Sequence, residues 1–380
     1  MKVWGILCVA AVLVACNQDH IFFSIAQEVD LVDPKINGTP TTPVELDGTV
    51  YVASKLGGTV HTYADGAWGG MAKQPGGHIL ALAVTEGYLF ALTTFNGDPA
   101  GSVTLRSIGL TEIQNNGDWK TVGAPRRSQS LYAAGTRVFV GVMTDTGTFK
   151  DDDGTEAVVE VSSTRVSGFE IWGGTEDATD LACLKEKTTF LTGAAFDGTT
   201  YYLAVNRPYA HGGGIYTFDG STVSNAAVSG SKGLDMAGIL ALGDNSVVGA
   251  ARNGALLYGN SGGFTPLLTG VTFTGAMGLW KNESGEVRLL LLGAQGGSTS
   301  TTHGYREMAL GSDGAFDAAS RLSSPGSGEN STITNADKYE SSLRRHPVVG
   351  IIQAPDRTLF AATVKNGLWA YRNDEWNAEE

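Results

Sequence analysis

The chain has 380 residues, of which 42% are hydrophobic and 52 are glycine. It can therefore bury a large core, but it is too rich in turn residues for a mainly helical fold. Its formal net charge is −13 and its isoelectric point is about 4.9. This balance argues against generic nucleic-acid binding and against adhesion of the whole body to anionic lipid, because both need a basic surface.

The N-terminal segment has the layout of an export signal. Lys2 is followed by an apolar run from Val3 to Val14, which is shorter than the roughly 20 residues that a membrane-spanning helix needs. Residues 1–15 are therefore predicted to be a signal peptide. The Leu-Val-Ala-Cys ending at residues 13–16 resembles the bacterial lipoprotein signal, and an ordinary cleaved secretory signal is the alternative. The resemblance implies that Cys16 is lipidated and anchors the chain on the extracytoplasmic side of a bacterial membrane, with Asn17 favouring the outer membrane.

Residues 16–43 are predicted to be the lipidated tether. Its one apolar patch, Ile21–Ile25, could add a strand to the body. Because Cys8 lies in the removed segment and Cys16 carries lipid, Cys183 is left alone and no disulfide framework is expected. We interpret Cys183 as a small buried hydrophobe.

From residue 44 to residue 380 the chain repeats one pattern of strands and turns. Each copy has an approach strand, a strongly apolar strand, a glycine-containing turn, an aromatic-bearing strand and an edge strand. In the last copy, Leu359–Thr363 is the apolar strand and Leu368–Tyr371 the next one. Asn366-Gly367 between them is predicted to take the two positive-φ positions of a hairpin turn, and Trp376 begins the edge strand.

Seven copies of this pattern can be aligned. The equivalent positions of their aromatic-bearing strands are Tyr63, Leu105, Phe169, Phe218, Tyr258, Tyr305 and Tyr371. The period is about 40–45 residues, with two insertions of roughly 20. This pattern predicts an all-β fold, a β-propeller of seven four-stranded antiparallel blades, with six or eight blades as alternatives. The strand plan resembles the WD-repeat and NHL-repeat class of propellers, although a regular Trp-Asp ending is lacking.

An acidic run in the third copy supplies clustered oxygen ligands. Asp151, Asp153 and Glu156 are the candidate ligands of a calcium ion, the one cofactor that the sequence suggests. A calcium loop would have an acidic residue at position 149, where this chain has Phe149, and a glutamate at its twelfth position, which is also missing here. A solvated acidic loop is the alternative.

Two glycine-rich motifs imitate the machinery of an esterase. His211–Gly214 matches an oxyanion loop, and Gly259–Gly263 matches the nucleophile elbow around Ser261. The elbow needs a helix after the serine, whereas Ser261 is expected in the turn between the third and fourth strands of copy five. The Asp-Gly turns also resemble the Asp-box of sialidases, but hairpin chemistry explains them. No catalytic residue is therefore predicted.

Basic residues gather, by repeat alignment, on the face that carries the long loops. Turns between second and third strands and links between blades supply the candidate ligand-binding residues Lys55, Arg126, Arg127, Arg207, Arg252, Arg344, Arg345 and Lys365. Insertions on one face of a repeat protein often mark its binding face. The alternative is that polar turns favour Lys and Arg beside Asn-Gly.

These observations predict a binding or scaffold module in the bacterial cell envelope. The expected partners are the membrane, through the lipid anchor, and a protein, a glycan or another anionic ligand, but not nucleic acid. One alternative is a propeller-type glycoside hydrolase or lyase, which would need two carboxylates set across the sugar. A second is an outer-membrane assembly factor that resembles the propeller lipoprotein of the barrel-assembly machinery.

Overall fold

The computed structural model describes residues 36–55, 57–94, 102–143, 146–150, 156–160, 166–172, 182–184, 190–206, 213–220, 223–229, 234–243, 245–252, 254–268, 272–282, 284–285, 287–294, 304–310, 342–372 and 375–379. They belong to the unit Ile36–Glu379. The predicted signal peptide, Cys16 and the apolar patch at residues 21–25 lie outside the described residues.

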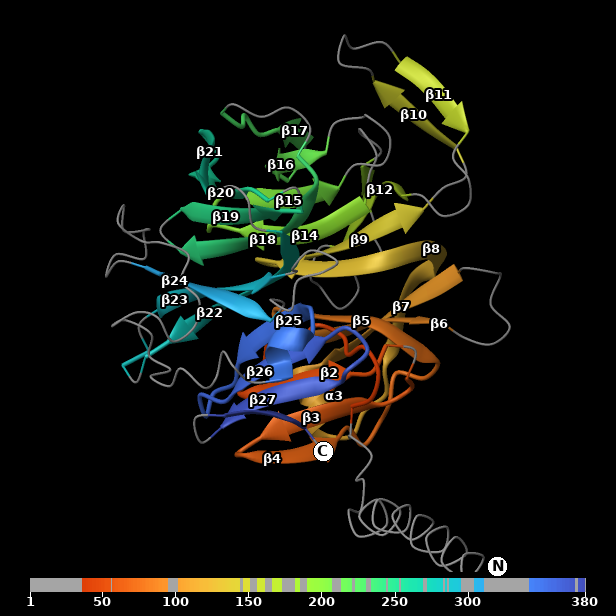
Figure 1. Cartoon of the computed structure of the whole chain (residues 1–380). Coiled ribbons are helices and arrows are strands. Elements are labelled where there is room, and N and C mark those ends of the chain that lie inside the picture. The colour runs from red at the N-terminus through yellow and green to blue at the C-terminus, as the bar shows by residue number, and fades with distance from the viewer. Residues whose placement is uncertain are drawn as a thin grey trace, which may run out of the picture. The chain divides into compact units, whose positions relative to one another are not determined.

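Antiparallel strand pairing builds the sheets of the unit (Figure 1). The first sheet contains β1 (Val44–Leu46), β2 (Thr49–Ala53), β3 (Val60–Ala64) and β4 (Ala67–Gly70). A seven-stranded sheet follows, with β5 (His78–Thr85), β6 (Tyr88–Thr94), β7 (Ser102–Gly109), β8 (Lys120–Ala134), β9 (Arg137–Met143), β12 (Val166–Trp172) and β13 (Ala182–Leu184).

The remaining sheets repeat the same strand order. The next two are four-stranded, with β14 (Phe190–Phe196), β15 (Tyr201–Asn206), β16 (Gly214–Phe218) and β17 (Val223–Asn225), then β18 (Met236–Gly243), β19 (Ser246–Ala251), β20 (Leu256–Asn260) and β21 (Gly263–Leu268). The following sheet has β22 (Phe273–Lys281), β23 (Val287–Ala294) and β24 (Tyr305–Ala309). The last has β25 (Val348–Gln353), β26 (Leu359–Thr363), β27 (Leu368–Arg372) and β28 (Glu375–Ala378).

The second strand of each repeat is buried along its length, as its continuous apolar sequence predicts. Every residue of β19 and of β26 is buried, and so is β2 from Val50 to Ala53. Such a strand has a neighbouring strand on each side and another sheet over each face, so polar alternation is absent. The predicted apolar and aromatic-bearing strands of all seven copies are confirmed.

The described sheets of three or more strands number six, where the sequence predicts seven. The difference lies in β8, whose Lys120–Arg127 part pairs with β7 and whose Ser128–Ala134 part pairs with β9. The edge strand of the second copy thus continues without a break into the approach strand of the third. Pro125 lies where the β7 ladder shifts register, so its missing N–H group costs no ladder hydrogen bond.

Seven clusters of buried apolar residues join the described sheets. Six of them lie between successive sheets, and one lies between the two halves of the seven-stranded sheet, where Phe90 and Leu105 meet Val138 and Val140. One of the six joins the last sheet to the first (Figure 1). The succession of clusters therefore returns to its start, and the sheets form the closed ring of a β-propeller.

The seam between the first and last sheets is closed by polar contacts as well as by packing. The Tyr63 hydroxyl donates to Asp356 Oδ2 at 2.5 Å, and Trp68 Nε1 donates to the buried Glu379. Each of these contacts joins the first repeat to the last. The ring is thus closed by packing between two sheets. The first sheet contains β1–β4 and the last contains β25–β28, and neither takes a strand from the other end of the chain.

Residues 36–41 form a strap across this seam. Ile36 is fully buried in the cluster between the first and last sheets. The carbonyl of Gly38 accepts the Gly367 N–H at 2.7 Å, and the Thr39 carbonyl accepts the Lys55 N–H at 2.8 Å. The segment that the sequence assigns to the end of the tether thus contacts both ends of the propeller.

The strap explains a difference from the predicted hairpin at Asn366-Gly367. Positive φ angles occur at Lys365 (65°) and Gly367 (69°), and Asn366 has none. The Lys365 N–H donates to Thr39 Oγ1 at 3.0 Å and the Gly367 N–H donates to Gly38. Because the strap fixes both ends of the turn, the local preference of Asn-Gly for a two-residue turn is overridden.

Two small elements interrupt the propeller pattern. The helix α3 (Leu110–Gln114) joins β7 to β8, where no helix was expected. β10 (Thr146–Lys150) pairs with β11 (Glu156–Glu160), and this strand pair flanks the acidic run that begins at Asp151. In the part of the chain that the structure describes, no helix has the length and apolar character to cross a membrane.

Candidate functional site

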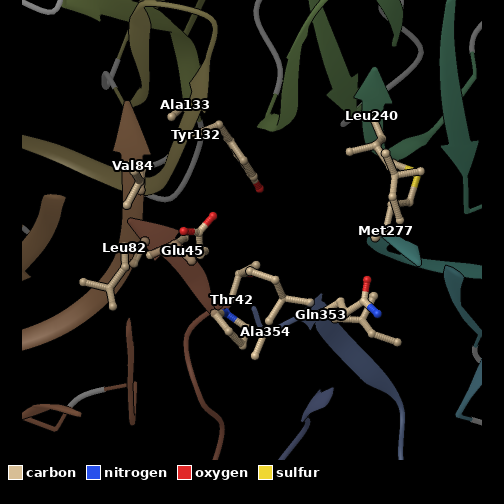
Figure 2. Close-up of a pocket in the computed structure, with 18 of the residues that line it drawn as sticks. Thr42, Glu45, Leu82, Val84, Tyr132, Ala133, Leu240, Met277, Gln353 and Ala354 are labelled. Atoms are coloured by element: carbon tan, nitrogen blue, oxygen red, sulfur yellow. The ribbon is translucent and has the colours of Figure 1, made fainter. Parts of the chain in front are cut away.

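The first strand of each repeat, predicted as the approach strand, is here called the inner strand. Inner strands of the ring border a cavity of about 900 Å³ (Figure 2). Its walls come from β1, β5, β8, β18, β22 and β25, together with turns that follow β2, β22 and β25. The lining residues therefore come from five of the six sheets of the ring, and no residue of β14 is among them. The cavity size falls in the range of roughly 300–1,000 Å³ that ligand pockets occupy.

Most of the lining is apolar. The main apolar side chains are Val44, Leu80, Leu82, Val84, Leu131, Leu240, Met277, Leu279, Ile351 and Ile352. Figure 2 shows Leu240 and Met277 on the side of the cavity opposite Tyr132 and Val84. A mainly apolar cavity with a few convergent polar groups is typical of a small-molecule site.

Tyr132 is a polar side chain that extends into the cavity. It leaves β8 and its hydroxyl points toward the middle of the space (Figure 2). Burial raises the pKa of Tyr132 to about 12, although the charge of Arg252 acts to lower it. The hydroxyl is therefore protonated over the physiological range and can donate a hydrogen bond. No described residue makes a hydrogen bond with it.

The other polar lining groups are partly held by the protein. Glu45 Oε1 accepts the Gly48 N–H at 2.7 Å. Gln353 clamps the backbone of Lys281, accepting its N–H at 2.8 Å and donating to its carbonyl at 3.0 Å. The Arg357 guanidinium lies 5.7 Å from the centre of the Trp280 ring, a cation–π distance.

Among the predicted binding residues whose side chains the structure describes, Lys55 lines the cavity. It follows β2, in a turn between second and third strands as predicted. Lys55 is exposed, but the surrounding protein displaces part of the water around its ammonium group and so lowers its pKa. An anionic group bound nearby would reverse that effect.

Arg252 and Lys365 occupy the corresponding turns after β19 and β26. Both are exposed. The Arg252 N–H donates to the Asp235 carbonyl at 2.7 Å, and its charge influences the Tyr132 hydroxyl. Lys55, Arg252 and Lys365 thus follow the second strands β2, β19 and β26, and of these three only Lys55 is part of the cavity wall.

The remaining predicted residues are spread over several settings. Arg126 and Arg127 pair with Val103 and Ser102 inside β8, so the predicted link between blades is extended strand. Arg344 and Arg345 lie in a 3-10 helix, Ser342–Arg345, where Arg345 is exposed. Arg207, Asp151, Asp153 and the side chain of Glu156 lie outside the described residues. Among the residues that are described, no cluster of His, Cys, Asp or Glu could hold a metal ion.

The esterase-like motif does not form a nucleophile elbow. Ser261 lies in the turn between β20 and β21, as expected, and a strand follows it where the elbow needs a helix. Residues 211 and 212 of the other motif lie outside the described residues. Within the described lining of the cavity, Glu45 is the one acidic side chain, so the pair of carboxylates that a glycosidase needs is not found there.

Sequence reasoning missed the residues of the channel wall. Tyr132, Leu240, Met277 and Gln353 all lie on inner strands, which the repeat alignment treated only as approach strands. The available signal was the mixed character of these strands, for example Ser130–Ala133, in which polar and aromatic residues interrupt an apolar run.

No known family model and no curated protein matches this chain. Solved propellers do match its fold. The WD40 β-propeller domain of Doa1 aligns with 90% of this chain and 95% of its own, at 10% identity and a TM-score of 0.51. A catalytically inactive virginiamycin B lyase from Staphylococcus aureus, solved with quinupristin, aligns with 88% of this chain and 94% of its own, at 12% identity and a TM-score of 0.52. At these identities the likeness shows the β-propeller fold and nothing of the ligand.

Proposed function

We propose that this protein is a ligand-binding propeller whose site is the central channel. The observation that carries the proposal is the cavity of about 900 Å³, walled mainly by aliphatic side chains and entered by the Tyr132 hydroxyl. A cavity that combines aliphatic surface with a few polar side chains favours capture of a small amphipathic molecule over catalysis. A glycoside hydrolase is less well supported than a binding site, because it needs two carboxylates and Glu45 is the single acidic side chain of the described lining.

We also propose that the ring has seven blades. The support comes from the seven buried clusters, one of which lies between the halves of the seven-stranded sheet. On this interpretation β8 is shared by two blades, as edge strand of one and inner strand of the next. Each half then has the four strands of a blade.

The proposed location is the extracytoplasmic side of a bacterial membrane, with Cys16 as the lipid attachment site. The support is the sequence at residues 13–16 after a short apolar run. Cys16→Ser should move the protein into the soluble extracytoplasmic fraction. Retention of this variant in the membrane phase of a detergent partition would contradict the anchor.

A further part of the proposal is an anionic ligand or partner drawn to the basic residues of the long-loop face. Lys55 and Arg252, which lie in equivalent turns, support it. The short range of such an attraction, about 8–10 Å at physiological salt, is compatible with an acidic body. We also propose a calcium ion at Asp151, Asp153 and Glu156, which titration of the protein with calcium would test.

The channel proposal is tested by filling the cavity. The probe is anilinonaphthalene sulfonate, titrated by fluorescence into the full chain carrying Cys16→Ser, so that no detergent is present. Met277→Trp should weaken probe binding at least tenfold, because the larger ring occupies the space between Met277 and Tyr132. Leu267→Trp is the matched control, since Leu267 packs on the same buried cluster but lies on the outer strand β21.

The channel proposal fails if both variants bind the probe as the unsubstituted protein does. Folding of each variant is checked by its circular dichroism spectrum and melting temperature. If Met277→Trp does not fold, Val84→Phe provides the same obstruction from the facing wall (Figure 2).

A further inference from the structure

The described wall of the channel carries more positive than negative charge. Its basic side chains are Lys55, Lys281 and Arg357, and Glu45 is the one acidic side chain. This excess stands against a body whose formal net charge is −13. Charges around a cavity with low-dielectric walls focus their field into it, so the local sign matters more than the sign of the whole protein.

Two donors of this wall are free to meet a ligand. The Tyr132 hydroxyl points into the cavity (Figure 2) and bonds to no described residue. Lys55 lines the cavity, is exposed and forms no ion pair with a described residue. Glu45, by contrast, already accepts the Gly48 N–H. The groups that stay available therefore suit an acceptor with negative charge.

The opposite wall suits an apolar body. Leu240 and Met277 face Tyr132 across the cavity (Figure 2). Methionine is unbranched and polarisable, so it adapts to ligands of different outline and contacts aromatic rings favourably. A molecule in the cavity would thus meet hydrogen-bond donors as well as aliphatic surface.

We propose that the channel selects an anionic amphiphile, a small molecule with one carboxylate or sulfonate on an aliphatic or aromatic body. The acidic group bonds to Tyr132 and Lys55, and the body packs on Leu240 and Met277. This inference rests on the proposed channel site and adds the class of its ligand. It also separates Lys55 from the equivalent Lys365, which does not line the cavity.

Two probes with the same ring system test the charge preference. Anilinonaphthalene sulfonate carries the anionic group, and N-phenylnaphthylamine has the same aromatic body without it. Both are titrated by fluorescence into the full chain carrying Cys16→Ser. The sulfonate should bind about tenfold more tightly, as expected for a hydrogen bond to a charged group, and this preference should shrink as salt is raised.

Conservative variants assign the preference to residues. Tyr132→Phe and Lys55→Gln should each reduce the sulfonate preference several-fold and leave the binding of the neutral probe unchanged. Lys365→Gln is the matched control and should change neither. The neutral probe also reports whether the channel is intact in each variant.

The outcomes separate this inference from the channel proposal. If both probes bind equally and Met277→Trp blocks both, the channel site stands and the anionic preference is overturned. If the preference survives in Tyr132→Phe and Lys55→Gln, the assigned donors are wrong. If neither probe binds, or Met277→Trp has no effect, the channel site itself fails.

Discussion

At the scale of single residues, Asp197 illustrates how a short turn between inner and second strands is fixed. Its Oδ1 accepts the N–H groups of Thr199 at 2.9 Å and Thr200 at 2.8 Å, and its Oδ2 accepts the Tyr202 hydroxyl at 2.6 Å. Burial by itself raises the pKa of this carboxyl, but the hydrogen bonds outweigh it and lower the pKa overall. The ionised form is therefore the one that stabilises the turn.

Asp197→Asn should lower the free energy of unfolding by about 1 kcal/mol at pH 7, because the amide replaces one acceptor oxygen and removes the charge. A carboxyl whose pKa is lower in the folded than in the unfolded chain contributes stability above the unfolded pKa. That contribution is lost as pH falls through the folded pKa. The two proteins should therefore converge in acid.

Urea unfolding at pH 7 and at about pH 3 measures this dependence. Asp65→Asn is the control, since Asp65 sits in the tight turn between β3 and β4 with φ at 51°, a conformation that asparagine also tolerates. It should cost little at either pH. An Asp197→Asn defect of equal size at both pH values would contradict a role for the ionised carboxylate.

At the scale of elements, the strands of the repeats could be predicted because their signal is local. Leu359–Thr363 and Leu368–Tyr371 are apolar and aromatic runs bounded by turn residues, and β26 and β27 cover them. The continuity of β8 could not be predicted in this way. Gly123 and Pro125 look like a break in the sequence, whereas tertiary pairing keeps them extended by a register shift in the ladder.

The predicted positive-φ positions of the turn at Asn366-Gly367 were wrong for a similar reason. Its positive φ angles lie at Lys365 and Gly367 because a strap from the other end of the chain bonds to both. Contacts between residues more than 300 positions apart leave no local pattern. Turn chemistry in a sequence is thus reliable for the existence of a turn and less so for its type.

Glu379, which directly follows the edge strand β28, holds the seam from the outside. Glu379 is 6% exposed, and it accepts hydrogen bonds from Trp68 of the first sheet and Arg372 of the last. Glu379→Ala should lower the free energy of unfolding by about 2 kcal/mol, because it leaves two donors without their partner. Glu375→Ala in β28 should have little effect, since Glu375 is exposed.

Denaturant unfolding of both variants measures the difference. Equal stabilities would show that the polar contact adds nothing to the packing of the seam. Deletion of residues 374–380 is a harsher version of the same test, because it also removes β28 and bares the edge of β27. That truncated chain is expected to aggregate.

At the scale of the whole molecule, repetition made the fold predictable and the site difficult to predict. The seven aligned copies imply a ring, and a ring implies a channel. Which side chains line that channel depends on how each inner strand is oriented between the two neighbouring sheets. Tyr132, Met277 and Gln353 come from different repeats and share no spacing in the sequence, so only the assembled ring brings them to one cavity.

Charge shows the same separation of scales. The net charge of −13 excludes a generally basic surface, but it does not fix the sign of the charge inside the ring. The charged side chains of the described lining are the basic Lys55, Lys281 and Arg357 and the acidic Glu45. The repeat alignment identified Lys55 as a binding candidate. It could not separate Lys55 from Lys365, which occupies the equivalent turn but does not line the cavity.

The central claim is that the ligand lies inside the ring, and a crystal structure of the protein soaked with anilinonaphthalene sulfonate tests it most directly. The predicted result is electron density for the ring system against Leu240 and Met277, with the sulfonate within hydrogen-bond distance of the Tyr132 hydroxyl. Density for the probe only on an outer face of the propeller, with the channel free of it, would contradict the account.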